Sequence, residues 1–219
     1  MADPLAALRA EVCRLHAELP RNGLVAWTSG NLSARVPDED LMLIKPSGVA
    51  YADLTPDVMV LCDFDGTAVE GDLAPSSDAA THGHVYRHMP QVGGVVHTHS
   101  PYATAWAIRG EAIPCVMTAI ADEFGGAIPL GPFALIGDET IGRGIVETLA
   151  GQRSRAVLMR SHGVFTIGAD AEGATKAAVL CEDAARTVFL ARSLGEISPL
   201  DTGDIDALHD RYQHVYGQH

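Results

Sequence analysis

The sequence predicts a single α/β domain over residues 1–219, in which a mixed, mainly antiparallel β-sheet is flanked by helices. Three observations favour this class. Short apolar stretches of strand character recur along the chain. They are more numerous than one parallel sheet with regular crossovers would contain, and segments with helical spacing lie at the start, middle and end. A chain of 219 residues fits one domain and can bury a core without disulfides.

The composition restricts the partners and the location of the protein. Its formal net charge of −13 argues against nucleic acid and against anionic membrane surfaces as partners. An anionic substrate must then be held by a local site. The cysteines form no Cys-x-x-Cys pair and indicate reduced thiols in a cytoplasmic protein: Cys13, Cys62, Cys115 and Cys181. Neither a signal peptide nor a membrane-spanning run is expected, since no apolar stretch approaches the required length.

The first 70 residues predict a helix followed by strands and tight turns. Asp3-Pro4 is typical of a helix start, and apolar residues at helical spacing continue the helix to Pro20. His16 within it is interpreted as a residue of the helix face and not as a ligand. Strands are then predicted over 32–36, 41–44 and 58–63, the last pairing back with 68–70 as a hairpin.

The remaining chain predicts helices and strands in alternation. Helices are expected over 78–90, 101–110, 138–149, 171–195 and 205–216. Strands are expected over 92–97, 113–118, 156–160 and 164–168. In the helix after Ser100-Pro101, the apolar face is expected to contain Tyr102, Ala105, Trp106 and Ile108. Asp122-Glu123, followed by Gly125-Gly126, is interpreted as a solvated turn.

The end of the predicted strand 92–97 carries a candidate metal site. Side chains two apart on a strand point to one face, so His97 and His99 should present two imidazoles together. His162 lies at the tip of another predicted strand, and Asp78 lies at a helix start. Three neutral imidazoles suit a borderline ion such as Zn²⁺, with a carboxylate or substrate oxygens completing the shell. The alternative is one hydrogen-bonded core histidine and one loop histidine.

Three turns within the first 80 residues share a chemistry that suits an anion. They combine hydroxyls, backbone N–H groups and the geometry of glycine or proline: Thr28-Ser29-Gly30-Asn31, Lys45-Pro46-Ser47-Gly48 and Pro75-Ser76-Ser77. Such turns can form a nest of N–H groups around a phosphate, and Lys45 adds a point charge. The alternative is three ordinary surface turns. We interpret them as a phosphate site.

Motifs in this order and spacing resemble the class II aldolase and adducin-head family over nearly the whole chain. They are Gly-Asn-Leu-Ser at 30–33, Lys-Pro-Ser-Gly-Val at 45–49, Pro-Ser-Ser-Asp at 75–78, Val-His-Thr-His-Ser-Pro-Tyr-Ala at 96–103 and Ser-His-Gly-Val-Phe-Thr-Ile-Gly at 161–168. Within the family, the chain is most similar to the epimerases of L-ribulose 5-phosphate. Asp78 supports that branch, because fuculose-phosphate aldolases carry a glutamate there. The terminal Tyr216-Gly217-Gln218 resembles the same branch.

The resemblance implies a class II aldolase-like α/β/α fold, a metal ion, a sugar-phosphate substrate and a pair of acid/base groups. Zn²⁺, with Mn²⁺ or Co²⁺ as alternatives, would be held by Asp78, His97, His99 and His162. The phosphate of a ketose would be bound by Gly30, Asn31, Lys45, Ser47, Gly48, Ser76 and Ser77. Retro-aldol cleavage between C3 and C4, followed by bond formation on the other face, would convert L-ribulose 5-phosphate to D-xylulose 5-phosphate. Asp122, and Tyr216 from a neighbouring subunit, would move the protons within a homotetramer whose active sites lie at subunit boundaries.

The chain departs from the epimerase pattern around Asp122. The family pattern is His-Ala-Asp-Tyr-Phe-Tyr-Gly, whereas this chain reads Ile-Ala-Asp-Glu-Phe-Gly-Gly over 120–126. A second acid, Glu123, therefore adjoins Asp122, and His209 or His214 is a candidate replacement for the missing histidine. One alternative function is a class II aldolase that cleaves a phosphorylated ketose such as L-fuculose 1-phosphate. A remoter one is a non-catalytic adducin-like module, which is expected to lack the histidines that this chain retains.

Overall fold

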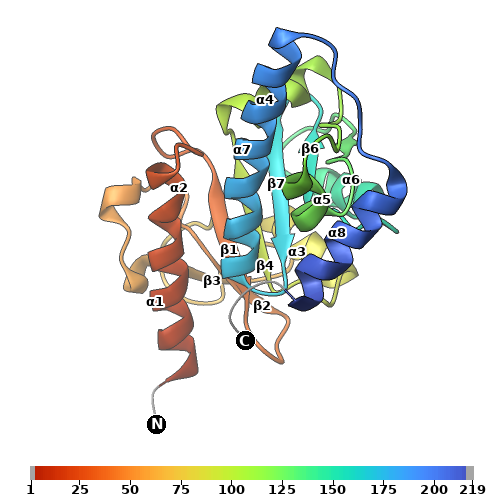
Figure 1. The fold of residues 1–219 in the computed structure, drawn as a ribbon. Coiled ribbons are helices and arrows are strands. Elements are labelled where there is room, and N and C mark those ends of the chain that lie inside the picture. Colours follow the sequence, from red (N-terminus) through yellow and green to blue (C-terminus); the bar gives the residue numbers. More distant parts are fainter. Residues whose placement is uncertain (1–2, 216–219) are drawn as a thin grey trace.

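A seven-stranded mixed sheet forms the centre of the computed structural model, which describes residues 3–215 (Figure 1). The strands are β1 Asn31–Arg35, β2 Leu41–Ile44, β3 Val60–Asp63, β4 Gly94–Thr98, β5 Leu130–Gly131, β6 Ala156–Met159 and β7 Gly163–Gly168. Their order in the sheet is β3-β2-β1-β4-β7-β6-β5. All neighbours are antiparallel except β5 and β6, which are parallel. The predicted fold class is confirmed.

Helices cover both faces of this sheet (Figure 1). They are α1 Pro4–His16, α2 Glu18–Arg21, α3 Ala79–His88, α4 Pro101–Arg109, α5 Thr118–Phe124, α6 Thr140–Leu149, α7 Ala171–Leu194 and α8 Thr202–Val215, with 3-10 turns η1 Tyr51–Asp53 and η2 Pro56–Val58. α3 and α6 pack on one face, and α1, α4, α5 and α7 pack on the other. None of the helices in the described part of the chain has the length and apolar content needed to cross a membrane.

Period-two alternation along the strands divides the core between these faces. Val95 of β4 and Phe165 of β7 pack with the side chains of α3 and α6. The residues next to them, Val96 and Val164, pack on the opposite face with α7. His97 lies two residues after Val95, so its side chain belongs to the face covered by α3 and α6.

Two predictions in the middle of the chain are wrong. Asp122 and Glu123 lie in helix α5 and not in a solvated turn, and Gly125 is the C-cap of that helix with φ +59°. Glycine favours this left-handed conformation, so the Gly-Gly pair marks the end of a helix. The expected strand over 113–118 is reduced to one isolated bridge between Ile113 and Ile128.

One prediction about a helix face also needs correction. Ala105 and Ile108 are exposed, because the buried face of α4 is formed by Ala103, Trp106 and Ala107. His16 is fully buried and links α1 to the sheet. Its Nδ1 donates to the carbonyl of Val12 over 2.8 Å, and its Nε2 accepts from the Leu32 amide over 3.1 Å. The imidazole therefore satisfies an amide of β1.

Candidate metal and substrate site

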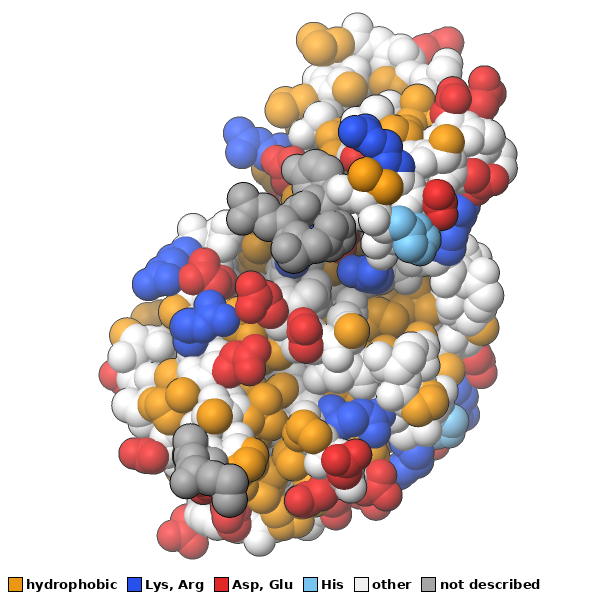
Figure 2. All heavy atoms as spheres, turned by 60° about the horizontal axis from the view of Figure 1, so that its bottom comes forward, with side chains coloured by type: hydrophobic (Ala, Val, Ile, Leu, Met, Phe, Trp, Pro, Cys, Tyr) orange, Lys and Arg blue, Asp and Glu red, His pale blue; other side chains and the backbone are white. Residues whose placement is uncertain are grey.

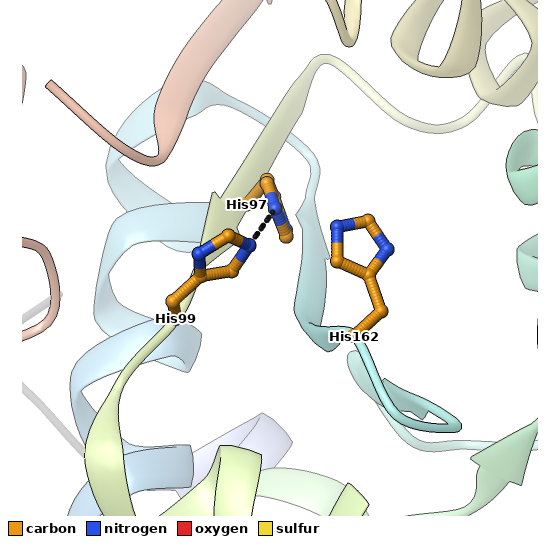
Figure 3. Close-up of side chains that lie close together, drawn as sticks. All are labelled: His97, His99 and His162. Atoms are coloured by element: carbon orange, nitrogen blue, oxygen red, sulfur yellow. Dashed lines mark hydrogen bonds between the residues drawn. The ribbon is translucent and has the colours of Figure 1, made fainter. Parts of the chain in front are cut away.

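Three imidazoles converge where β4 ends and β7 begins (Figure 3). His97 is in β4, His99 follows its end, and His162 lies in the turn between β6 and β7. Antiparallel pairing places Thr98 opposite Val164, which brings the two strand ends together. One nitrogen from each ring lies within 4.8 Å of the others, and the Nε2 atoms of His97 and His99 are 3.0 Å apart. The three rings therefore lie together, and their assignment as metal ligands stays a prediction.

Surrounding groups fix the ring of His97. Its Nδ1 donates to the carbonyl of Val164 over 2.9 Å, which leaves the Nε2 lone pair directed at the cluster. The ring stacks on Phe165 at 4.1 Å between centroids. Burial lowers the pKa of His97 to about 3, so the imidazole stays neutral. A neutral, oriented nitrogen donor beside two others fits the ligand set of a divalent cation of the zinc type.

A strained turn supplies the third imidazole. Ser161 has φ +56°, a left-handed conformation that is unusual for a residue other than glycine. Its amide donates to the carbonyl of Ala107 over 3.1 Å, which holds the turn against the end of α4. Burial lowers the pKa of His162 as well. The histidines of α3, which are His82, His84 and His88, do not join the cluster.

Asp78 lies beside the cluster without being one of the three converging groups. It is the N-cap residue of α3, and its Oδ2 accepts from Asn31 Nδ2 over 2.6 Å. Burial opposes ionisation of the Asp78 carboxyl, but His97, His82 and the Asn31 bond outweigh it and hold its pKa below the ordinary value. Asp78 is thus an ionised carboxylate whose charge acts on His97 and His162.

The structure joins the three predicted phosphate turns. Pro46 and Pro75 form a bridge, and the Ser76 amide donates to the carbonyl of Lys45 over 2.9 Å. Lys45 Nζ reaches the carbonyls of Thr28 and Pro46, each at 3.3 Å. The side-chain amide of Asn31 donates to Ser76 Oγ over 3.0 Å. Backbone and side-chain contacts therefore bring the turns into one region next to Asp78.

Lys45 carries a buried charge in this region. Its side chain is 2% exposed and, within residues 3–215, forms no ion pair. Burial lowers its pKa, because carbonyl oxygens compensate a desolvated ammonium only in part. Ser47, Gly48 and Ser77 around it are exposed. An anion bound by these turns would supply the missing countercharge.

Gly30 shows why this turn needs glycine. It has φ +76°, and a Cβ there would lie 2.6 Å from Val25 Cγ1 and 2.9 Å from the carbonyl oxygen of His97. Tyr51 Oη donates to the carbonyls of Ser29 and Gly30, each over 3.0 Å. The turn is therefore packed directly against the strand that carries His97.

Of the two predicted acid/base groups, the structure describes only Asp122. Asp122 is half-buried on α5, and in the described part of the chain its side chain forms no hydrogen bond or ion pair with them. Its backbone carbonyl accepts from His209 Nδ1 over 2.9 Å. Tyr216 lies outside the described residues, one position after the end of α8.

Sequence reasoning missed the buried environment of Glu123. This carboxylate is 1% exposed and is surrounded by Lys176 Nζ at 3.0 Å, Tyr212 Oη at 2.9 Å and Arg155 Nη1 at 3.7 Å. These partners come from α7, α8 and the residue before β6. No local pattern indicates such long-range pairing, although Gly125 could have identified the helix that carries Glu123.

Comparison with known proteins finds one family and one relative that match most of this chain. Residues 10–189 match the family described as Class II Aldolase and Adducin N-terminal domain. The chain is 43% identical over 204 residues to the L-ribulose-5-phosphate 4-epimerase UlaF of Salmonella paratyphi B, a match that covers 89% of this chain and 90% of that protein.

Solved structures give similar results. An L-fuculose 1-phosphate aldolase superposes with a TM-score of 0.89 at 26% identity, covering 97% of this chain and 98% of that one. The L-fuculose-1-phosphate aldolase of Thermus thermophilus superposes with a TM-score of 0.72 at 25% identity, covering 85% and 96% of the two chains.

Proposed function

Since this chain belongs to the class II aldolase and adducin N-terminal domain family, we propose that it is a metal-dependent epimerase that inverts C4 of L-ribulose 5-phosphate to give D-xylulose 5-phosphate. The observation that carries the proposal is the convergence of His97, His99 and His162 beside the joined phosphate turns. The nearly full-length match to a protein named for this reaction favours the epimerase over other members of the family.

We infer that the joined turns hold the phosphate of the ketose. Lys45 would provide the buried positive charge, and exposed turn residues would provide N–H and hydroxyl donors. The full set is Gly30, Asn31, Lys45, Ser47, Gly48, Ser76 and Ser77. Holding the phosphate at one end restricts the orientations of the carbon chain and so favours reaction at a single bond.

We infer further that His97, His99 and His162, together with Asp78, hold a divalent cation, with Zn²⁺ as the first candidate and Mn²⁺ or Co²⁺ as alternatives. When bound, such an ion supplies Lewis acidity for the negative charge that develops on the ketose oxygens. Burial lowers the pKa of His97 and of His162, which favours the neutral ligand form of both, and the Val164 carbonyl holds the His97 ring in place.

Inversion at C4 requires two proton transfers on opposite sides of the substrate. The C4 hydroxyl loses a proton as the C3–C4 bond breaks, the aldehyde fragment rotates, and the oxygen regains a proton when the bond forms on the other face. We assign these transfers to Asp122 and Tyr216. The resemblance places only Tyr216 in a neighbouring subunit. Because no hydrogen bond or ion pair joins the Asp122 side chain to the histidines among residues 3–215, we infer that the neighbouring subunit supplies both groups, in a homotetramer with active sites at the subunit boundaries.

The location proposed for the enzyme is the cytoplasm. All four cysteines are free, and Cys62, Cys115 and Cys181 are buried. Unpaired thiols of this kind are typical of reducing compartments.

Product analysis tests the function. The purified, Zn²⁺-loaded protein is incubated with L-ribulose 5-phosphate, and the products are identified by ¹³C NMR. We expect D-xylulose 5-phosphate to accumulate without free aldehyde. The class II aldolase is the second candidate, favoured by the structural match to an L-fuculose 1-phosphate aldolase. Release of aldehyde from L-fuculose 1-phosphate, with no epimerisation of the pentulose, would support it and refute the epimerase.

A further inference from the structure

The contacts of Glu123 connect three separate elements. Its Oε2 lies 3.0 Å from Lys176 Nζ on α7 and accepts from Tyr212 Oη on α8 over 2.9 Å. The ammonium of Lys176 also lies over the Tyr212 ring, 4.8 Å from its centroid. A carboxylate that is 1% exposed is stable only when it is paired, so Glu123 holds both partners close. We call Glu123, Lys176 and Tyr212 the α5–α8 clamp.

Helix α8 depends on polar contacts of this kind. It has no fully buried residue, and only partly buried side chains such as Ile205 and Leu208 pack it on the core. Further polar contacts link it to the rest of the chain. They are Arg153 to Asp206 at 2.7 Å, Arg155 to Gln213 at 2.9 Å and His209 to the Asp122 carbonyl at 2.9 Å. The clamp differs from these contacts in that its carboxylate, Glu123, is buried, while its Lys176 side chain is 48% exposed.

The clamp lies between the two proposed acid/base groups along the chain. Glu123 follows Asp122 directly on α5, and α8 carries Tyr212 and ends at Val215, the residue before Tyr216 in the sequence. α5 and α8 lie side by side (Figure 1). A displacement of α8 would therefore move Val215, the residue before Tyr216, relative to Asp122.

We propose that Glu123, Lys176 and Tyr212 are positioning residues that fix α8 against α5 and thereby set the spacing between Asp122 and the chain end that carries Tyr216. This inference rests on the proposed function, because it needs both groups to act on the same substrate. The clamp residues do not touch the reacting atoms. They act by placing the groups that do, since proton transfer requires a donor within hydrogen-bonding reach.

The test uses Tyr212→Phe, which removes one hydroxyl and leaves Glu123 paired with Lys176, so that the fold persists. We expect kcat for epimerisation to fall about tenfold, with KM and metal content unchanged, as a small misplacement of a catalytic group would produce. Asp210→Asn is the matched control on α8, because Asp210 is exposed and its carboxylate pairs with His214 of the same helix. The control should keep the wild-type kcat.

A double-mutant cycle with Tyr216→Phe tests whether Tyr212→Phe lowers kcat through Tyr216. If the clamp acts through the chain end, the double variant has nearly the kcat of Tyr216→Phe alone. The clamp proposal would be overturned if the reductions in kcat of the two single variants multiply in the double variant. It would also be overturned by an unchanged kcat in Tyr212→Phe or by a wild-type kcat in Tyr216→Phe. Failure of the proposed function is distinguishable, because the wild-type protein would then show no epimerisation before any variant is compared.

Discussion

The β4–β7 strand ends and the α5–α8 pair carry different halves of the proposed active site and are held by different forces. At the strand ends, backbone pairing fixes His97, and the Val164 carbonyl orients its ring. Around α5, side-chain contacts between elements far apart in sequence hold Glu123 and its partners. The metal half should therefore resist substitutions outside its ligands, whereas the acid/base half should respond to single changes in polar contacts.

The histidine cluster also differs in charge from the molecular surface. The strand-end cluster consists of three imidazoles, and one buried carboxylate, Asp78, lies beside it. On the molecular face seen in Figure 2, acidic and basic side chains are interspersed over the surface. With a net charge of −13, the overall field of the chain repels an anionic substrate, so the proposed phosphate site at Lys45 would have to bind it locally.

The largest effect is expected at the metal half. His97→Ala removes an oriented imidazole, so bound metal should be lost and turnover should fall by at least about a thousandfold, because a catalytic metal contributes several kcal/mol. Metal analysis and steady-state kinetics measure both. His88→Ala is the control, since that imidazole lies on α3 outside the three-histidine cluster. Full metal occupancy in His97→Ala would remove His97 from the ligand set.

A smaller effect is expected at the acid/base half. Asp122→Asn should keep the metal and slow epimerisation about a hundredfold, the usual contribution of one general acid or base. Metal content and kcat measured together separate the two regions. Unchanged turnover would refute the role of Asp122, and loss of metal would show that the two halves are not independent.

The pH dependence of stability tests the buried contact that His16 makes between α1 and β1. Burial lowers the pKa of His16 to about 4, from 6.5 in the unfolded chain. Between these values the unfolded chain binds a proton that the folded chain does not. The contribution of His16 to the free energy of unfolding is therefore fully present above pH 6.5. It decreases by roughly 3 kcal/mol as the pH falls toward 4. Urea unfolding of wild type and His16→Gln across this pH range should show a shallower dependence in the variant; identical slopes would contradict this.

The smallest effect is expected at the phosphate turns. Lys45→Met should raise KM for the phosphorylated ketose about tenfold to a hundredfold, since a hydrogen bond to a charged group contributes about 1.5–3 kcal/mol. Turnover at saturation should change little. Unphosphorylated L-ribulose serves as the control substrate and should react equally poorly with both proteins. An equal change in KM for both substrates would show that Lys45 does not bind the phosphate.

The pairing of His97 with His99 could be predicted from sequence because its geometry is local, whereas the approach of His162 depends on strand pairing. Period-two alternation places His97 and His99 on one face, and the antiparallel pairing of β4 with β7 adds His162. The phosphate turns also carry their own composition. Sequence did not indicate that Pro46 pairs with Pro75, yet that bridge joins two of the turns.

The acid/base half could be predicted only by resemblance. Asp122 and Glu123 have the composition of an exposed turn, and the burial of Glu123 depends on Lys176 and Tyr212, which lie far along the chain. The contact that His16 makes with the sheet could not be predicted for a related reason. Its partner is the amide of Leu32 in β1, which becomes a neighbour only when α1 packs on the sheet. Long-range polar pairing leaves no periodic trace in the sequence.

X-ray absorption at the zinc edge tests most directly whether His97, His99 and His162 form the proposed metal centre. The wild-type protein is loaded with one equivalent of Zn²⁺, and the fine structure is fitted for imidazole ligands. The account predicts three histidine nitrogens at about 2.0–2.1 Å from the metal, falling to two in His162→Ala. A spectrum with one imidazole or none, or one that His162→Ala leaves unchanged, would contradict it.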